Sequence, residues 1–191
     1  MYIINKDYEE EINIKNSRFI TIISKINNKE EIQHILNKIK NKYPKATHYP
    51  YAYIIDNIKK SSDDNEPSGT AGIPILTILE HENINNILVV VVRYFGGIKL
   101  GTGGLVRAYT KVLKNFIKKE NLSELIKGKK VLLNFSYDKQ KNIDYLLKDY
   151  KIIKKEFDTT IKYEVLIPDN NINILNNYNY QIIEDIYIEK N

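Results

Sequence analysis

Apolar and β-branched residues interspersed with polar ones mark two segments near the start of the chain, residues 8–14 and 17–26, and a polar pair at residues 15–16 separates them. This pattern is typical of strands, so we predict two strands joined by a turn. In residues 29–43 the apolar positions recur every three or four residues, and Asn28 stands where an N-cap is expected. That spacing predicts a helix after the second strand.

Residues 46–56 alternate again, with Tyr49, Tyr51 and Tyr53 on one face, and predict a further strand. Pro50 has no N–H group to donate, so we expect it at an edge or a bulge of the sheet. The tyrosines can be interpreted in two ways. They are either a platform on which nucleic-acid bases stack, or half-buried sheet residues whose hydroxyl groups reach water.

Four segments follow, up to residue 119. Polar residues, glycine and proline dominate residues 59–72 and predict a loop. Residues 71–81 predict a helix, although their β-branched composition also allows a strand. Residues 86–95 are mostly an unbroken apolar run, which is typical of a central strand covered on both faces. Residues 105–119 carry apolar residues along one helical stripe and predict another helix.

The last third of the chain has a pattern of its own. It predicts a strand, a helix, two strands, a helix and a strand, at residues 129–137, 138–150, 151–158, 159–168, 169–178 and 180–188. The order βαββαβ is that of a ferredoxin-like unit. We therefore predict an α+β protein of two domains, residues 1–122 and residues 123–191.

The composition excludes several kinds of functional site. The chain has no cysteine, which excludes disulfides, thiol nucleophiles and thiolate metal sites, and its three histidines lack the spacing of metal ligands. No apolar run approaches the roughly 20 residues of a membrane-spanning helix, and the acidic N-terminus does not resemble a signal peptide. We expect a cytoplasmic protein that contacts no membrane and uses no cofactor or metal.

The net charge of +5 is unevenly placed along the chain. Residues 1–120 contain 18 Lys and Arg against 13 Asp and Glu, whereas the remainder contains 11 of each kind. A positive surplus in one region suits a polyanionic partner, but an evenly solvated lysine surface would give the same count.

Arginine is rare, because the chain has 26 lysines and only Arg18, Arg93 and Arg107. A guanidinium group can hold a phosphate or carboxylate with two parallel hydrogen bonds, which an ammonium group cannot do. Each arginine therefore marks either an anion-binding position or a buried ion pair with an acidic residue.

Five of the eight glycines lie in residues 96–104, between the predicted central strand and the next helix. Glycine accepts positive φ, and the N–H groups of such a loop and helix start can hold an anion. Thr102 stands where a Walker loop would need lysine, so the spacing does not match a nucleoside triphosphatase. The alternative is that the glycines only form tight turns. The candidate anion-binding or nucleic-acid-binding residues are Arg18, His48, Arg93, Gly96, Gly97, Lys99, Gly101, Gly103, Gly104 and Arg107.

The polar loop before the predicted helix carries three acidic residues, Asp63, Asp64 and Glu66. Neighbouring carboxylates can bind Mg²⁺ or transfer protons. The alternative is structural: the carboxylates pair with the arginines, and Ser68 or Thr70 caps the next helix. The spacing matches no EF-hand, and we assign no catalytic residue.

Four stretches, SRFI, ATH, SSDDNEPSGTAGIPIL and VVVVRYFGGIKLGTGGLVRAY, closely resemble the signature of the IMPACT (YigZ-like) family over most of residues 17–117. The resemblance implies a first domain with the α/β fold of domain IV of elongation factor G and of a small-subunit ribosomal protein. It also implies a ferredoxin-like second domain similar to domain V of that factor, and a role in translation regulation. Tyr49 and Pro50 depart from the family pattern, in which Asn and Cys are expected.

Two functions are open at this point. In the first, the arginines, Lys99 and the glycine loop gather to hold phosphates of RNA, and the partner is the ribosome or a protein of the translation machinery. In the second, the chain is an enzyme for a small phosphorylated or nucleotide substrate, with the acidic loop as Mg²⁺ ligand or base. We predict the binding function; the oligomeric state does not follow from the sequence.

Overall fold

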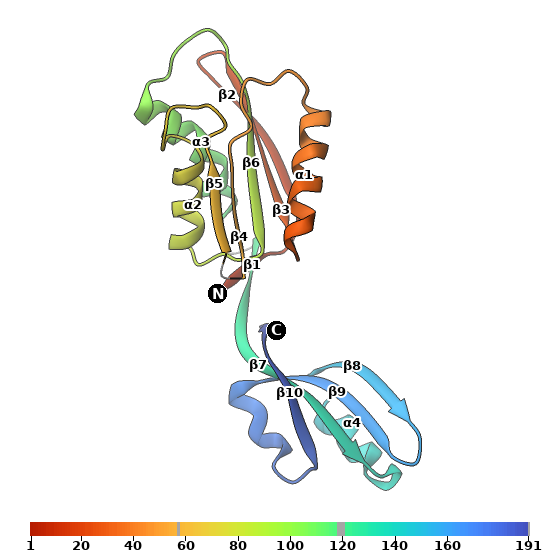
Figure 1. Cartoon of the computed structure of the whole chain (residues 1–191). Coiled ribbons are helices and arrows are strands. Elements are labelled where there is room, and N and C mark those ends of the chain that lie inside the picture. Colours follow the sequence, from red (N-terminus) through yellow and green to blue (C-terminus); the bar gives the residue numbers. More distant parts are fainter. Residues whose placement is uncertain (57, 118–120, 191) are drawn as a thin grey trace. The chain divides into compact units, whose positions relative to one another are not determined.

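The computed structural model describes residues 1–56, 58–117 and 121–190. The chain divides into two compact units, Met1–Ser123 and Glu124–Asn191, next to the predicted boundary, and each unit is described by itself (Figure 1). Both units contain helices and strands, so the predicted α+β class is confirmed. Within the described residues, no helix is long and apolar enough to cross a membrane.

The first unit is built on a five-stranded sheet in which neighbouring strands are antiparallel. In spatial order its strands are β2 (Tyr8–Ile14), β3 (Ser17–Lys25), β6 (Ile87–Tyr94), β4 (Tyr51–Ile55) and β5 (Ile58–Ser62). A short strand, β1 (Tyr2–Ile4), precedes them in the chain. The apolar strand β6 lies at the centre of the sheet and is buried on both faces, as its sequence predicted.

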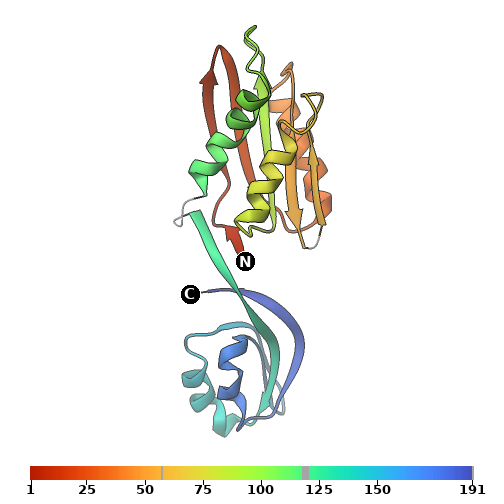
Figure 2. The ribbon, with the colours of Figure 1, turned by 90° about the vertical axis from the view of Figure 1, so that its left-hand side faces the viewer.

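Helices cover both faces of this sheet. Helix α1 (Lys29–Lys42) packs on one face, and α2 (Gly72–His81) and α3 (Thr102–Phe116) pack on the other, which Figure 2 views from the front. The side chain of Asn28 accepts a hydrogen bond from the N–H of Glu31, so the predicted N-cap of α1 is confirmed.

Three expectations for this unit need correction. The segment predicted as a loop contains β5, a polar strand at the edge of the sheet. Pro50 lies neither on an edge nor at a bulge but directly before β4, an inner strand, where His48 and Arg93 form an isolated bridge. The helix predicted for residues 105–119 begins earlier, at Thr102, and residues 118 and 119 lie outside the described residues.

The second unit has the predicted order of elements. Its strands β10 (Tyr180–Glu189), β7 (Leu122–Phe135), β9 (Ile161–Pro168) and β8 (Lys151–Phe157) lie side by side in that order and are antiparallel. Two helices, α4 (Gln140–Leu146) and η3 (Asp169–Leu175), pack against one face of the sheet. The ferredoxin-like order is confirmed, with the difference that η3 is a 3₁₀ helix.

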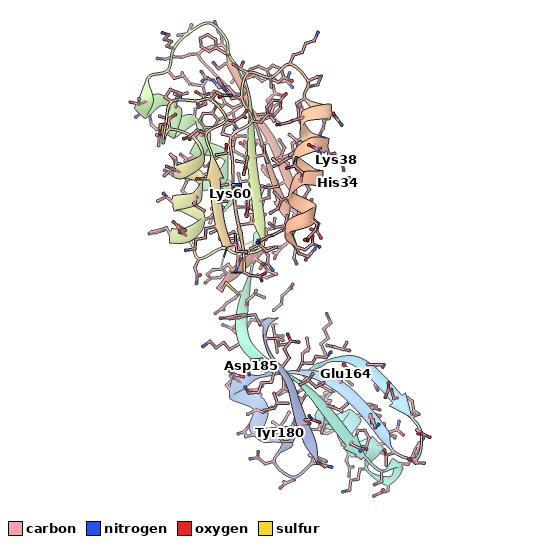
Figure 3. The ribbon with its side chains drawn as sticks, viewed as in Figure 1. His34, Lys38, Lys60, Glu164, Tyr180 and Asp185 are labelled. Carbon is pink, nitrogen blue, oxygen red and sulfur yellow. The ribbon has the colours of Figure 1, made fainter. Side chains whose placement is uncertain are left out.

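Lysines of the second unit form ion pairs within it. Lys130 pairs with Glu164 of β9 at 2.8 Å, and Lys129 pairs with Asp185 of β10. Figure 3 labels the two acidic partners, Glu164 and Asp185. Such pairs agree with the equal numbers of acidic and basic residues in this part of the sequence. The positive surplus of the chain belongs to the first unit.

Candidate functional site

Four loop segments lie at one end of the first unit's sheet, the upper end in Figure 1. They are the turn at residues 15–16, the segment 44–50, the acidic loop 63–71 and the glycine loop 95–101. The sheet brings them together because β3, β4, β5 and β6 all begin or end there. The residues that the sequence singled out are therefore at the same end of one domain.

Hydrogen bonds and close packing join these loops. The N–H of Phe95 donates to Thr47 Oγ1 at 3.0 Å, and the N–H of Gly96 donates to Ser17 Oγ at 3.2 Å. A Cβ atom at Gly96 would lie 2.0 Å from the carbonyl oxygen of Asn16, so no larger residue fits there without displacing the turn. The glycine loop is thus fixed at its start against two neighbouring loops.

The remaining glycines of the loop have other roles. Gly97 and Gly101 adopt φ angles of 84° and 72°, which side chains with a Cβ atom rarely adopt. Gly103 and Gly104 lie in the first turn of α3, which contains no acidic residue and whose N-cap, Gly101, makes no side-chain cap. The first N–H groups of a helix have no partner within the helix, so this end of α3 presents donors and a partial positive charge.

A buried polar network lies beneath the loops. The carboxylate of Glu66 accepts hydrogen bonds from Arg93 Nη1 and from the Tyr109 hydroxyl, both at 2.5 Å through the same oxygen. All three residues are buried. His48 Nε2 lies 3.8 Å from the same oxygen. Arg93 therefore forms the buried ion pair that was the second interpretation of the arginines.

This network fixes the protonation of Tyr109. Burial and the hydrogen bond to Glu66 raise the pKa of Tyr109 far above its ordinary value, so its hydroxyl stays a donor at neutral pH. The Arg93 guanidinium lies 5.3 Å from the ring centroids of both Phe19 and Phe95. Its Nε is buried and has no hydrogen-bond partner among the described residues.

The other two acidic residues of the loop bind backbone groups. Asp63 accepts hydrogen bonds from three N–H groups, those of Gly69, Ala71 and Gly72, and thereby caps α2. Asp64 accepts a hydrogen bond from the N–H of Tyr49 at 2.6 Å. Each carboxylate of the acidic loop therefore already has protein donors, but only Glu66 pairs with an arginine as the structural interpretation expected.

The expected cap of α2 needs correction. Neither Ser68 nor Thr70 caps the helix, because Ala71 occupies the N-cap position and the Thr70 hydroxyl donates to the carbonyl oxygen of Pro67. Asp63 acts instead, from eight residues away along the chain. No local sequence pattern indicates this cap, because Asp63 is not adjacent to the helix.

The three arginines do not gather, contrary to expectation. In the β3–β6 pairing Arg18 lies opposite Tyr94 and Arg93 lies opposite Phe19, so the two arginines point to opposite faces of the sheet. Arg18 is on the α1 face, with its guanidinium 5.2 Å from the Tyr94 ring centroid and its Nε 2.8 Å from Glu11. The strand register decides which face of the sheet each arginine takes, and the register cannot be read from the sequence.

Four exposed cations at this end of the unit form no ion pair within the described residues. We call them the basic end: Lys15, Lys45, Lys99 and Arg107. A Cβ atom added at Gly103 would lie 3.6 Å from Arg107 Nη1, so this guanidinium stands beside the first turn of α3. Because the acidic residues nearby already have partners, the charge that this end presents to solvent is mainly positive.

His48 joins the acidic loop to the strand before β4. Its Nδ1 donates to the carbonyl oxygen of Asp64 at 2.8 Å, because that oxygen can only accept. Among the described residues, no group of three or more His, Asp and Glu side chains is arranged to hold a metal ion. Anion binding by His48 stays a prediction.

Sequence reasoning missed three residues that matter here. Tyr109 looked like an ordinary member of the apolar stripe of α3, and Lys15 and Lys45 looked like loop lysines. The pairing of β3 with β6 and the packing of Gly96 on Asn16 place the turn of Lys15 next to the glycine loop. Hydrogen bonds from Tyr94 to Pro44 and from Phe95 to Thr47 place the segment of Lys45 there. The only local sign in the sequence was that Lys15 lies in the turn directly before the strand that carries Arg18.

Residues 15–117, just over half of the chain, match the family model of the Impact N-terminal domain. The chain belongs to the IMPACT family. IMPACT family member YigZ of Escherichia coli is 33% identical over 162 residues, which cover 81% of this chain and 79% of that protein. IMPACT family member YvyE of Bacillus subtilis is 50% identical over 106 residues, which cover 54% of this chain and only 49% of that protein.

A solved structure is similar over nearly the whole IMPACT-family chain. A crystal structure of a hypothetical protein has 28% sequence identity and a TM-score of 0.62, and it covers 96% of this chain and 97% of that one. The resemblance seen in the sequence is thus confirmed for the family. The likeness to domains IV and V of elongation factor G stays a prediction.

Proposed function

We propose that this chain takes part in the regulation of translation by binding RNA through the basic end, with the ribosome as the partner to test first. Membership of the IMPACT family supports the connection with translation. The observation that supports RNA binding is the contrast at one end of the unit between carboxylates that already accept protein donors and exposed cations that form no ion pair within the described residues. A surface of that kind attracts polyanions.

The glycine loop would contribute to this binding in two ways. Lys99 and Arg107 offer a point charge and a planar fork of donors, both of which contact phosphate oxygens. Beside them, the uncapped start of α3 offers N–H groups and the positive end of the helix dipole. These contacts would hold the sugar–phosphate backbone and carry little sequence preference.

Cosedimentation with ribosomal subunits at two salt concentrations tests the proposal. We expect the Lys99→Gln/Arg107→Gln double variant to bind more weakly, and its dependence of log K on log salt to be less steep by roughly 1.4. The matched control is Lys111→Gln/Lys114→Gln, which removes the same charge from exposed positions further along α3. Binding that is indifferent to the first pair, or equally reduced by both pairs, would contradict the proposal.

The alternative of an enzyme for a small phosphorylated substrate has no comparable support. Asp63, Asp64 and Glu66 each already accept protein donors, and His48 Nε2 stands 3.8 Å from Glu66 beside the buried ion pair. A thermal-shift screen with nucleotides and divalent ions still distinguishes the two functions. Strong stabilisation by one nucleotide, lost in Asp64→Asn, would favour the enzyme.

A further inference from the structure

An aromatic ring stands exposed among the cations of the basic end. Phe95 is 45% exposed, although it directly follows the buried central strand β6. Phenylalanine at such a position loses part of the stabilisation of burial, and the exposed part of its ring is accessible to a ligand. The RNA contacts proposed above use charge and backbone N–H groups and leave this ring without a role.

The loops around Phe95 place it between cations. Its N–H is bound by Thr47, two residues after Lys45, and the next residue, Gly96, packs on the turn that carries Lys15. Lys99 follows in the same loop. The phosphates of a bound strand would therefore meet cations on several sides of the ring.

The ring is also held in place from within. The Arg93 guanidinium lies 5.3 Å from its centroid, and Glu66 fixes that guanidinium at 2.5 Å. An aromatic ring backed by a buried ion pair loses little conformational freedom when a ligand binds, which favours stacking on its free surface. The ring and the cations together form a surface suited to a nucleic acid whose bases are accessible.

We propose that Phe95 stacks on an unpaired base, so that the partner of the basic end is single-stranded RNA or an unpaired stretch of a folded RNA. This inference rests on the proposed function and specifies its ligand. Bases within a duplex are covered by their neighbours, whereas unpaired bases can stack on aromatic side chains. Cations alone would not distinguish the two forms, but an exposed ring among them does.

The test uses the full chain and two labelled probes, a single-stranded oligoribonucleotide and a fully paired RNA duplex of the same length. Fluorescence anisotropy gives the affinity of each probe for the wild-type protein, Phe95→Leu and Ile98→Ala. Leucine keeps an apolar cover over Arg93 but has no aromatic face. Ile98 is a matched control because it is also 45% exposed in the same loop but has no ring.

We expect Phe95→Leu to weaken binding of the single strand about tenfold and to change duplex binding less than about twofold. Ile98→Ala should leave both affinities nearly unchanged. A 2-aminopurine base in the single strand should change its fluorescence on binding to the wild-type protein and not to Phe95→Leu, because stacking alters its emission. Thermal denaturation should show that both variants remain folded.

The other outcomes overturn the inference in distinguishable ways. If RNA binds through Lys99 and Arg107 but Phe95→Leu changes nothing, stacking is wrong and the proposed function stands; the ring would then suit a protein partner. If Phe95→Leu weakens both probes equally, the ring does not select unpaired bases. If neither probe binds the wild-type protein at low salt, the inference and the proposed function both fail.

Discussion

The buried network around Glu66 leads to a quantitative prediction for Tyr109→Phe. The substitution removes one hydroxyl group, which donates to the carboxylate at 2.5 Å, and leaves the ring in its edge-on contact with Phe19. Glu66 keeps its ion pair with Arg93, so no charge loses its counter-charge. The variant therefore isolates a single hydrogen bond to a buried charged group.

A hydrogen bond to a charged partner contributes about 1.5–3 kcal/mol to stability. We expect Tyr109→Phe to lower the free energy of unfolding of the first unit by about 2 kcal/mol. The control is Tyr94→Phe, because the Tyr94 hydroxyl donates at 3.1 Å to the neutral carbonyl oxygen of Pro44 in an exposed position. That change should cost less than about 1 kcal/mol.

Amide hydrogen exchange of residues 88–92 provides the measurement. These residues lie in the central strand and are buried, so their amides should exchange only when the first unit unfolds. A loss of about 2 kcal/mol corresponds to exchange about 30-fold faster. A change below about 0.5 kcal/mol, or one equal to that of Tyr94→Phe, would refute the assignment of the network as a stabilising element.

Three further predictions concern the same end of the unit. Because the pKa of Tyr109 is raised in the folded state, its protonated hydroxyl contributes its full stabilisation below pH 10. Above pH 10 the free energy of unfolding should fall by about 1.4 kcal/mol per pH unit through this group. Urea unfolding from pH 9 to 11 should therefore show a shallower decline of the free energy of unfolding for Tyr109→Phe than for the wild type. Gly96→Ala should destabilise by about 1–3 kcal/mol because its Cβ atom would overlap the carbonyl of Asn16, whereas Gly103→Ala, in a helix where the new Cβ atom would meet Arg107 Nη1 at an ordinary contact distance of 3.6 Å, should stabilise by about 0.5–1 kcal/mol. Equal thermal shifts would contradict this packing. Asp63→Ala should cost about 1–2 kcal/mol, measured by chemical denaturation, because three backbone N–H groups lose their acceptor, and an unchanged midpoint would exclude the cap.

Local pattern was sufficient to predict most elements. The helix that begins after Asn28, the central strand at residues 87–94 and the βαββαβ order of the second unit all follow from periodicity over many residues. Strand β5 was not predictable in this way, because Lys59 and Lys60 make it polar on both faces. It is an edge strand, and its structure depends on pairing with β4 rather than on burial of its own side chains.

The candidate site depended more on tertiary structure. The sequence marked the correct loops, because glycines and rare arginines stand out against an Ile-, Asn- and Lys-rich background. It could not separate Arg18 from Arg93, since one step of strand register decides which face each side chain takes. Nor could it pair Glu66 with Tyr109, which is 43 residues further along the chain.

The acidic loop and the basic end therefore have different roles, one in stabilising the fold and the other in presenting charge to solvent. Asp63 caps α2, and buried Glu66 joins β6 to α3, whereas the cations of the basic end are exposed and form no ion pair in the part of the chain that the structure describes. Removing Glu66 should thus lower stability by about 3–5 kcal/mol, because a buried cation is left alone, and should weaken RNA binding only indirectly, through unfolding and through loss of the ion pair that holds the Phe95 ring. Neutralising Lys99 should weaken binding while stability stays constant, because an exposed charge without a partner contributes little to folding. If binding and stability changed in proportion for Lys99 as well, the cations would belong to the framework of the fold and not to a surface for a ligand.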